Sequence, residues 1–132
     1  MGRWHEIARY ENIFEKGLMG VKTNYTLLPD GTVKIENRGI THSGKTKRIY
    51  GTAYRPYSQL PAHFRVSFFW WFSSDYNVIM LDDDYQFSVV SGNTGKYLWI
   101  LSRTATLKTE VLDKIFAFLR SRGHNPSRLI FT

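Results

Sequence analysis

Hydrophobic and polar residues alternate in short runs along most of this 132-residue chain, a pattern typical of β-strands with one buried and one solvent-facing side. Between Trp4 and Arg103 the sequence divides into eight apolar-rich runs, each followed by turn-forming residues. The runs are Trp4–Tyr10, Leu18–Leu28, Thr32–Thr41, Thr46–Arg55, Ala62–Trp71, Asp75–Leu81, Tyr85–Ser91 and Lys96–Arg103. We therefore expect eight consecutive antiparallel strands.

The last runs differ from the earlier ones because they are apolar on both sides. Asn77–Leu81 and Tyr97–Leu101 show no alternation, which predicts that both faces of these strands are covered. We expect the cover to be a helix over about 108–122, where apolar residues recur at helical spacing and the pattern stops at Gly123. Packing against the strands explains its apolar stripe better than a partner or a membrane face does. A short ninth strand is expected over about 127–131.

Eight short strands leave two exposed edges, and closure into a barrel is the surest way to remove them. We therefore predict an all-β fold in a single domain over 1–132: an eight-stranded antiparallel up-and-down β-barrel over about 3–103 with one C-terminal α-helix packed outside. Closure makes the first and last strands neighbours, so Trp4 should meet Arg103 at one end. A guanidinium over an indole is a favourable cation–π pair, and it would plug the base of the barrel.

The two end strands of the predicted barrel carry a short signature. Gly2 and Trp4 form a Gly-x-Trp motif on the first strand, and Arg103 ends the last strand. In these residues the chain resembles the lipocalin family. Three blocks are similar to the branch of bacterial outer-membrane lipocalins and apolipoprotein D-like proteins: Trp4–Arg9, Ser74–Ile79 with Asp75, and Tyr97–Arg103. The resemblance covers nearly the whole chain and implies a closed barrel that binds one hydrophobic ligand for transport or storage and catalyses nothing.

An eight-stranded barrel is just wide enough inside to hold one small ligand. Strand alternation predicts which residues face the interior, if the residues of the base pair point inward. The predicted lining is mostly apolar and aromatic and consists of Glu6, Ala8, Tyr25, Ile35, Asn37, Phe64, Val66, Phe68, Tyr76, Val78, Tyr97 and Trp99. Tyr10 and Met80 fall on the same side, and the small Gly51 and Ala53 should leave space there. The alternative is that these side chains fill the barrel as a solid core.

The loops at the end opposite Trp4 form the predicted mouth. Its apolar lips are Phe14, Trp70 and Trp71, and its basic rim is Lys45, Lys47 and Arg48. An acyl chain would enter here while the rim holds a carboxylate or phosphate headgroup, which makes a fatty acid or a lysophospholipid the expected ligand. The aromatic residues are equally consistent with peripheral membrane contact or a homodimer interface, and the basic residues with ordinary solvated charge. A monomer and a homodimer both stay open.

The chain is basic, with a net charge of +7 and a pI near 9.8, and 16% of its residues are aromatic. A β-barrel that binds single-stranded nucleic acid or another anionic polymer would share these features. Such a protein carries aromatic residues on the wet face of neighbouring strands, whereas the cleanly alternating strands here place lysine and arginine there. Nucleic-acid binding is therefore the alternative function, and we expect no nucleic-acid partner.

No catalytic or metal-binding motif is evident in the sequence. It has no Gly-x-Ser-x-Gly elbow, phosphate-binding loop or His-Glu-x-x-His motif, so we expect no catalytic residue and no enzymatic activity. Asp82, Asp83 and Asp84 lie in a predicted turn, where acidic residues are commonplace. Cysteine is absent, and we expect neither a metal nor a cofactor.

The resemblance implies an outer-membrane or periplasmic location. The sequence starts directly at the Gly-x-Trp motif, with neither a signal peptide nor a lipoprotein lipobox before it, and no apolar run is long enough to span a membrane. We therefore expect a cytoplasmic variant or a shortened chain, and the location stays undecided.

Overall fold

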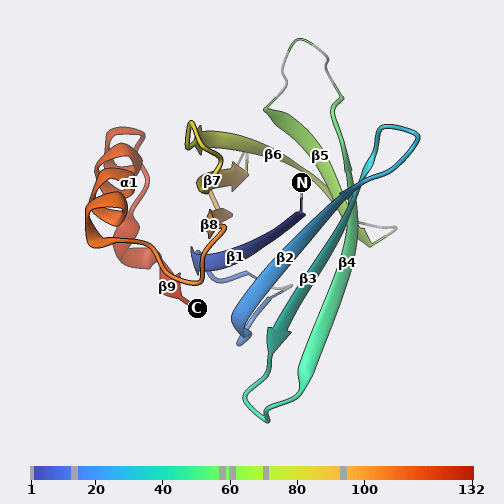
Figure 1. The fold of residues 1–132 in the computed structure, drawn as a ribbon, viewed down its shortest axis with the longest axis horizontal. Coiled ribbons are helices and arrows are strands. Elements are labelled where there is room, and N and C mark those ends of the chain that lie inside the picture. The colour runs from blue at the N-terminus through green and yellow to red at the C-terminus, as the bar shows by residue number, and fades with distance from the viewer. Residues whose placement is uncertain (1, 13–14, 57–58, 60–61, 70–71, 93–94) are drawn as a thin grey trace.

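A computed structural model of the chain describes residues 2–12, 15–56, 59, 62–69, 72–92 and 95–132. Eight antiparallel strands follow one another around a closed barrel, which confirms the predicted fold (Figure 1). Their bounds are β1 Gly2–Arg9, β2 Met19–Leu27, β3 Val33–Ile40, β4 Thr46–Tyr54, β5 His63–Phe69, β6 Phe72–Leu81, β7 Phe87–Gly92 and β8 Leu98–Ser102. Each strand from β1 to β8 pairs with the next, and β8 also pairs with β1, which closes the barrel.

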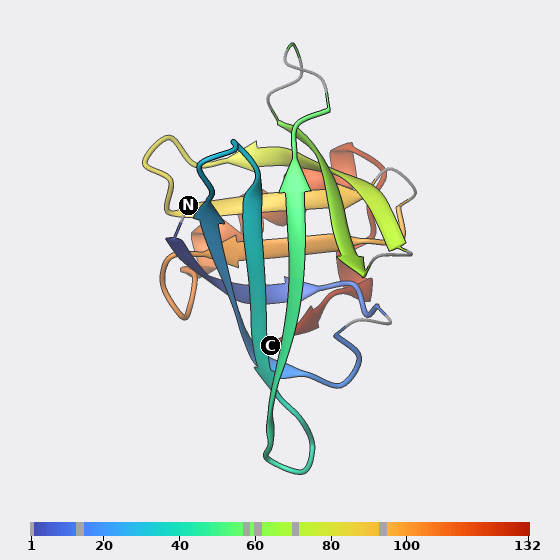
Figure 2. The same ribbon diagram turned by 90° about the vertical axis from the view of Figure 1, so that its right-hand side faces the viewer.

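The closing seam between β1 and β2 is completed by the C-terminal segment. The pairs between β1 and β2 cover Gly2–His5, and the ninth strand, β9 (Ile130–Phe131), pairs with β1 further along. Thr132 links both sides of the seam, because its N–H donates to the Ile7 carbonyl at 3.0 Å and its carbonyl accepts from the Gly20 N–H at 3.3 Å. The last residues of the chain therefore lie beside β1 where β2 has separated from it (Figure 2).

The helix α1 (Thr109–Ser121) lies outside the barrel, on the side of β7 and β8 (Figure 1). Beneath it, buried residues of β1, β7, β8 and the C-terminal segments pack into one group, here called the outer cluster: Ile7, Ala8, Tyr10, Phe87, Val89, Leu98, Ile100, Ile115, Leu119 and Leu129. Strands under the helix are thus covered by apolar groups on their outer face. This packing confirms that the apolar stripe of the helix covers strands that are apolar on both sides.

Two β-bulges explain why some residues predicted to face inward face outward. The pairing of β1 with β8 shifts between Glu6 and Ala8, and the pairing of β6 with β7 shifts between Val78 and Met80. An extra residue in a strand reverses the alternation beyond it. Ala8, Tyr10 and Met80 accordingly belong to the outer cluster or pack against it, so the interior placement predicted for them is wrong.

The outward turn of Tyr10 anchors the segment that follows α1. This segment contains a short 3-10 helix, η1 (Pro126–Arg128), preceded by Asn125. The Tyr10 hydroxyl donates to the Asn125 carbonyl at 3.1 Å and accepts from the Asn125 N–H at 2.9 Å. The Arg128 guanidinium lies 4.3 Å from the centre of the same ring. Neither helix in the described ranges is long and apolar enough to cross a membrane.

Candidate functional site

The interior of the barrel holds a cavity of ≈ 250 Å³, so side chains do not fill it solidly. All eight barrel strands contribute to its wall, together with two residues from connections. The lining consists of Trp4, Glu15, Thr23, Tyr25, Val33, Ile35, Asn37, Ala53, Phe64, Val66, Phe68, Tyr76, Val78, Leu81, Tyr85, Ser88, Val90, Trp99 and Leu101. Most of these side chains are apolar or aromatic, which makes the cavity suited to an apolar ligand.

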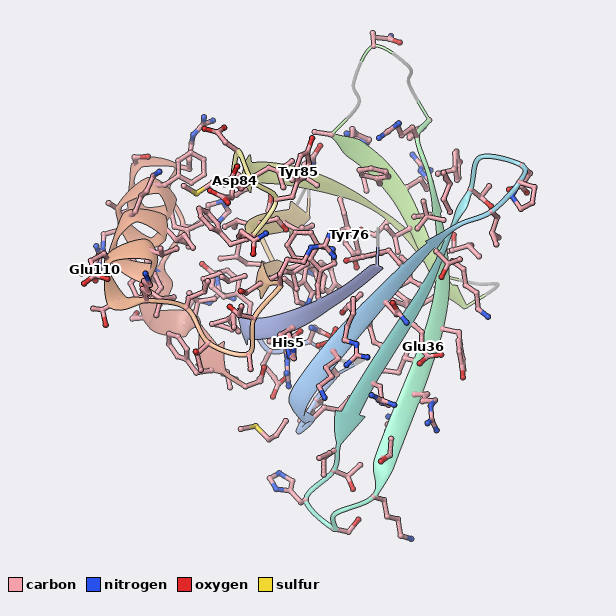
Figure 3. All side chains as sticks on the ribbon, viewed as in Figure 1. His5, Glu36, Tyr76, Asp84, Tyr85 and Glu110 are labelled. Atoms are coloured by element: carbon pink, nitrogen blue, oxygen red, sulfur yellow. The ribbon has the colours of Figure 1, made fainter. Side chains whose placement is uncertain are left out.

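Three aromatic rings form one wall of the cavity region. Tyr76 meets Trp99 edge-on with ring centres 5.0 Å apart, and Tyr97 stacks on Trp99 with ring centres 5.8 Å apart. Tyr76 lies inside the barrel (Figure 3). Trp99 also lines the cavity, whereas Tyr97 packs behind it. The stack fixes the orientation of the indole that faces the cavity.

At one end of the cavity the Arg103 guanidinium lies 3.8 Å from the centre of the Trp4 ring. This is the contact that the strand count predicts. Arg103 also donates to the backbone carbonyls of Arg3 at 3.0 Å and Tyr85 at 3.3 Å. Gly2 has a φ of +82°, a backbone conformation that favours glycine at this position next to Arg103.

Two residues of the lining near this end are exposed. Leu81 and Tyr85 line the cavity and are 46% and 60% exposed, whereas the other lining residues are buried or half-buried. Tyr85 is held next to Arg103 by the backbone hydrogen bond described above. A ligand that reaches the cavity past Leu81 and Tyr85 would therefore pass close to a cationic side chain.

At the opposite end three carboxylates surround one buried arginine. The Nη1 of Arg9 donates to Glu6 at 2.8 Å, and its Nη2 donates to Glu11 at 3.0 Å. The Nε of Arg9 lies 3.8 Å from Oε2 of Glu15. The Nη2 also donates to the backbone carbonyls of Glu15 at 2.7 Å and Leu18 at 3.0 Å, which fastens the connection between β1 and β2 to the barrel. One cation among three acidic groups makes this end electronegative.

Burial and the neighbouring Glu6 carboxylate raise the pKa of Glu15 well above its ordinary value, against the opposing effect of Arg9. Burial also raises the pKa of the Tyr25 and Tyr76 hydroxyls, and Glu15 contributes to both shifts. Oε2 of Glu15 and the Tyr76 hydroxyl have no hydrogen-bond partner within the described part of the chain. The Tyr76 hydroxyl therefore lies in the lining without a hydrogen bond to any described residue, and Oε2 of Glu15 keeps only its longer contact with Arg9.

A second polar pair in the wall is satisfied within the protein. The Thr23 hydroxyl donates to the Asn37 side-chain oxygen at 2.7 Å, and both residues are buried. Asn37 is thus held by its neighbour on the adjacent strand. The Tyr76 hydroxyl, by contrast, has no hydrogen bond within the described residues.

Most of the residues predicted to line the interior do border the cavity. The nine that do so are Tyr25, Ile35, Asn37, Phe64, Val66, Phe68, Tyr76, Val78 and Trp99. The other three do not: Glu6 is buried against Arg9, Ala8 lies in the outer cluster beyond a bulge, and Tyr97 packs behind Trp99. That any of these residues contacts a ligand stays a prediction.

The end of the barrel where the mouth is predicted contains a small buried cluster. It consists of Leu18, Val21 and Ile49, with Phe68 and Tyr97 packed against it. A Cβ at Gly51 would lie 2.9 Å from the Phe68 ring, so this glycine makes room for Phe68 rather than for a ligand. Ala53, by contrast, does line the cavity.

The basic rim predicted at this end is solvent-exposed. Lys45, Lys47 and Arg48 are all exposed, and none of them borders the cavity. The predicted lip residues Phe14, Trp70 and Trp71 lie outside the described residues. A role for either group in holding a headgroup stays a prediction.

Sequence reasoning missed Arg9 and Glu15. The bulge in β1 turns Arg9 inward to a position opposite Trp99, and alternation alone cannot anticipate a bulge. Glu15 lies in a connection, where alternation predicts no facing at all. The sequence does contain one indication of this cluster. Three glutamates and one arginine lie among apolar residues within Glu6–Glu15, and charged groups that are buried with apolar strand residues need partners of opposite charge.

Asp75 in the signature block has a structural contact with the neighbouring strand. Its carboxylate accepts from Arg65 Nε at 3.0 Å, and it lies 3.4 Å from His63 Nε2. These contacts link β6 to β5. Within the described residues no group of three histidine, cysteine or acidic side chains is arranged to hold a metal ion.

Comparisons with known proteins agree with this architecture. A family model described as a lipocalin-like domain matches residues 1–132. The outer membrane lipoprotein Blc of Vibrio cholerae is 38% identical over 133 residues, which cover 99% of this chain and 78% of that protein. Apolipoprotein D of Macaca fascicularis is 30% identical over 138 residues, which cover 99% of this chain and 72% of that protein. Lobster apocrustacyanin A1 has a similar fold, with a TM-score of 0.78 and 20% identity over 99% of this chain and 75% of its own.

The family match extends over the whole chain and agrees with the closed barrel, the outer helix and the pairing of Trp4 with Arg103. Proteins of this kind generally bind small hydrophobic ligands rather than catalyse reactions. The chain belongs to the lipocalin family.

Proposed function

We propose that this protein binds a single-chain amphiphile, a fatty acid or a lysophospholipid, in the barrel cavity for transport or storage. The observation that carries the proposal is the largely apolar cavity inside a closed barrel. Family membership supports the coarser function, the binding of a small hydrophobic ligand. Removing an acyl chain from water into such a cavity contributes about 0.8 kcal/mol for each buried CH₂ group.

The size of the cavity favours one acyl chain over two. Its volume of ≈ 250 Å³ lies just below the range of about 300–1,000 Å³ in which ligand pockets usually fall. Aromatic side chains such as Phe64 and Trp99 border this space and limit its width. A single acyl chain suits this volume, whereas a lipid with two chains would need the wall to open.

The basic residues at the predicted mouth support one orientation of the ligand. Lys45, Lys47 and Arg48 are exposed there, whereas Arg103 caps Trp4 at the other end. A carboxylate or phosphate headgroup is favoured near a cation. We therefore propose that the headgroup lies at this rim and the acyl chain inside.

Filling the cavity tests this function directly. Ala53→Phe adds a ring to the lining, so it should weaken binding of dodecanoate and of a lysophospholipid at least tenfold. Binding is measured by displacement of an uncharged fluorescent probe, and lipid that co-purifies with the protein is identified by mass spectrometry.

The neighbouring position on β4 provides the matched control. Thr52 is exposed on the outer face of the strand, so Thr52→Phe adds the same ring without entering the cavity. It should leave both affinities within about twofold of the unmodified protein. If neither amphiphile displaces the probe from the unmodified protein, or if both phenylalanine variants bind equally well, the proposed function is wrong.

A further inference from the structure

The outer face of β2, β3 and β4 carries three cations in one line, here called the cation row. Lys22 is paired with Arg38, and Arg38 is paired with Arg48, so the three residues lie side by side across adjacent strands. They alternate along the strands with buried residues such as Thr23 and Asn37, which line the cavity. The cation row therefore points away from the interior, on the side of the barrel that faces the viewer in Figure 2.

None of these three cations forms an ion pair within the described part of the chain. The one acidic residue of β2, β3 and β4 is Glu36, which lies in the next row along the strands, between Asn24 and Tyr50 (Figure 3). Neighbouring strands are about 5 Å apart, and like charges directly opposite one another destabilise a sheet. An anionic partner would remove this repulsion.

Further positive groups surround the cation row. His5 on β1 is paired with Lys22, and burial together with the charges of Lys22 and Arg3 lowers the pKa of His5. Lys34 lies on the outer face of β3, with its ammonium 5.7 Å from the centre of the Tyr50 ring. The positive charge thus extends over several adjacent strands, which suits an extended anionic surface better than one small anion.

Two exposed apolar side chains lie beside the cation row. Met19 is paired with Ile40, and the two are 47% and 50% exposed. Cations next to exposed aliphatic groups suit an anionic bilayer, where the cations meet the headgroups and the apolar groups reach the acyl boundary. A single-stranded nucleic acid would instead need aromatic rings free to stack on bases, and Lys34 already lies over the ring of Tyr50.

We propose that the outer face of β2, β3 and β4 binds the surface of an anionic phospholipid membrane, with the cation row against the phosphate headgroups and Met19 and Ile40 at the acyl boundary. Ile40 ends β3 next to the connection that leads to the predicted mouth, so docking would bring the mouth close to the bilayer. The inference is independent of the proposed function, because neither Lys22 nor Arg38 lines the cavity.

Binding to two kinds of vesicle tests the inference: phosphatidylcholine alone, and phosphatidylcholine with phosphatidylglycerol in a two-to-one ratio. The double variant Lys22→Gln, Arg38→Gln leaves Arg48 in place, since Arg48 also belongs to the predicted rim. It should weaken binding to the anionic vesicles about 25-fold, because each cation near such a surface contributes about fivefold. The double variant Met19→Ser, Ile40→Ser should weaken it about threefold or more.

The matched control removes the same charge from the other side of the barrel. Lys114 and Arg120 are exposed on α1, which lies away from β3 and β4 (Figure 1). The double variant Lys114→Gln, Arg120→Gln should keep its affinity for the anionic vesicles within about twofold, because charges more than about 10 Å from the bilayer are screened at 0.1 M salt.

Three results would overturn the inference: phosphatidylglycerol does not raise the affinity, the two charge variants lose affinity equally, or the variant at Met19 and Ile40 binds as tightly as the unmodified protein. Tighter binding to an oligothymidine than to the anionic vesicles, lost in the Lys22 and Arg38 variant, would also overturn it and assign the face to nucleic acid. Dodecanoate binding by the Lys22 and Arg38 variant should be unchanged, which separates this inference from the proposed function. Thermal unfolding of each variant shows that a lost affinity does not come from lost folding.

Discussion

The two faces of the strands under α1 are packed in different ways. On the outer face the cluster beneath the helix includes Ala8, Val89, Leu98, Ile100, Ile115 and Leu119, which are 0% exposed and apolar. On the inner face the same strands border a cavity of ≈ 250 Å³ that contains unpartnered polar atoms. One face is filled with protein, and the other leaves room for a ligand.

This difference indicates a division of roles. Close-packed apolar contacts stabilise a fold, while an internal cavity and buried charges destabilise it. The outer cluster should therefore supply much of the stability that the hollow interior does not. Substitutions in the outer cluster should mainly lower the free energy of unfolding. Substitutions in the cavity wall should mainly change ligand affinity.

The largest effect is expected at Arg9, which belongs to neither apolar region. Arg9→Met would leave Glu6 and Glu15 buried without their cation, which costs about 3–5 kcal/mol of unfolding free energy. Denaturant unfolding measures the loss. Arg48→Met is the control, because Arg48 is exposed and the same change there should cost less than about 0.5 kcal/mol. Equal losses in the two variants would show that the Arg9 cluster does not support the fold.

The direct comparison is between Leu119 in the outer cluster and Val78 in the cavity wall. Leu119→Ala creates a new void in a filled region and should cost about 2–5 kcal/mol while leaving ligand affinity unchanged. Val78→Ala only enlarges an existing cavity, so its cost should be smaller and its effect on affinity larger. Unfolding and probe displacement are measured on both variants. A larger stability loss at Val78 would contradict the division of roles.

The sequence predicts the architecture well, since eight runs, one helix and the meeting of Trp4 with Arg103 all follow from periodicity and closure. It predicts the cavity wall well in regular stretches of β3 and β5, where Ile35, Phe64 and Val66 line the cavity as alternation requires. Prediction fails beyond each bulge, because one inserted residue reverses every later position and no single residue type announces it.

The polar end of the site was beyond prediction for a related reason. Arg9 faces inward only because of the bulge in β1, and Glu15 lies in a connection whose path depends on tertiary contacts. Gly51 shows the opposite case: its small size was recognised, but the space that it leaves is taken by Phe68. Which neighbour fills a space is decided by packing in three dimensions.

A smaller effect is expected in the pH dependence of stability. The folded state raises the pKa of Glu15, mainly by burial and then through Glu6, so the folded protein binds this proton more tightly than the unfolded chain does. The contribution of Glu15 to the free energy of unfolding should therefore be greatest below the ordinary carboxyl pKa and should be lost as the pH rises through the raised value.

Glu15→Gln tests this sign. The variant cannot ionise, so it should lose less stability than the unmodified protein as the pH rises above the ordinary carboxyl pKa. Denaturant unfolding at several pH values gives both slopes, and the difference between them isolates Glu15 from other titrating groups such as His5, whose pKa is lowered by burial. Parallel curves for the two proteins would show that Glu15 is not strained by burial.

Methyl NMR during a titration with dodecanoate tests the central claim, that the ligand binds inside the barrel, most directly. The account predicts that the methyl signals of Ile35, Val66 and Val78 in the cavity wall shift strongly, while those of Val89, Ile100 and Ile115 in the outer cluster stay nearly unchanged. Strong shifts confined to the outer cluster, or no shifts in the cavity wall at saturating ligand, would contradict it.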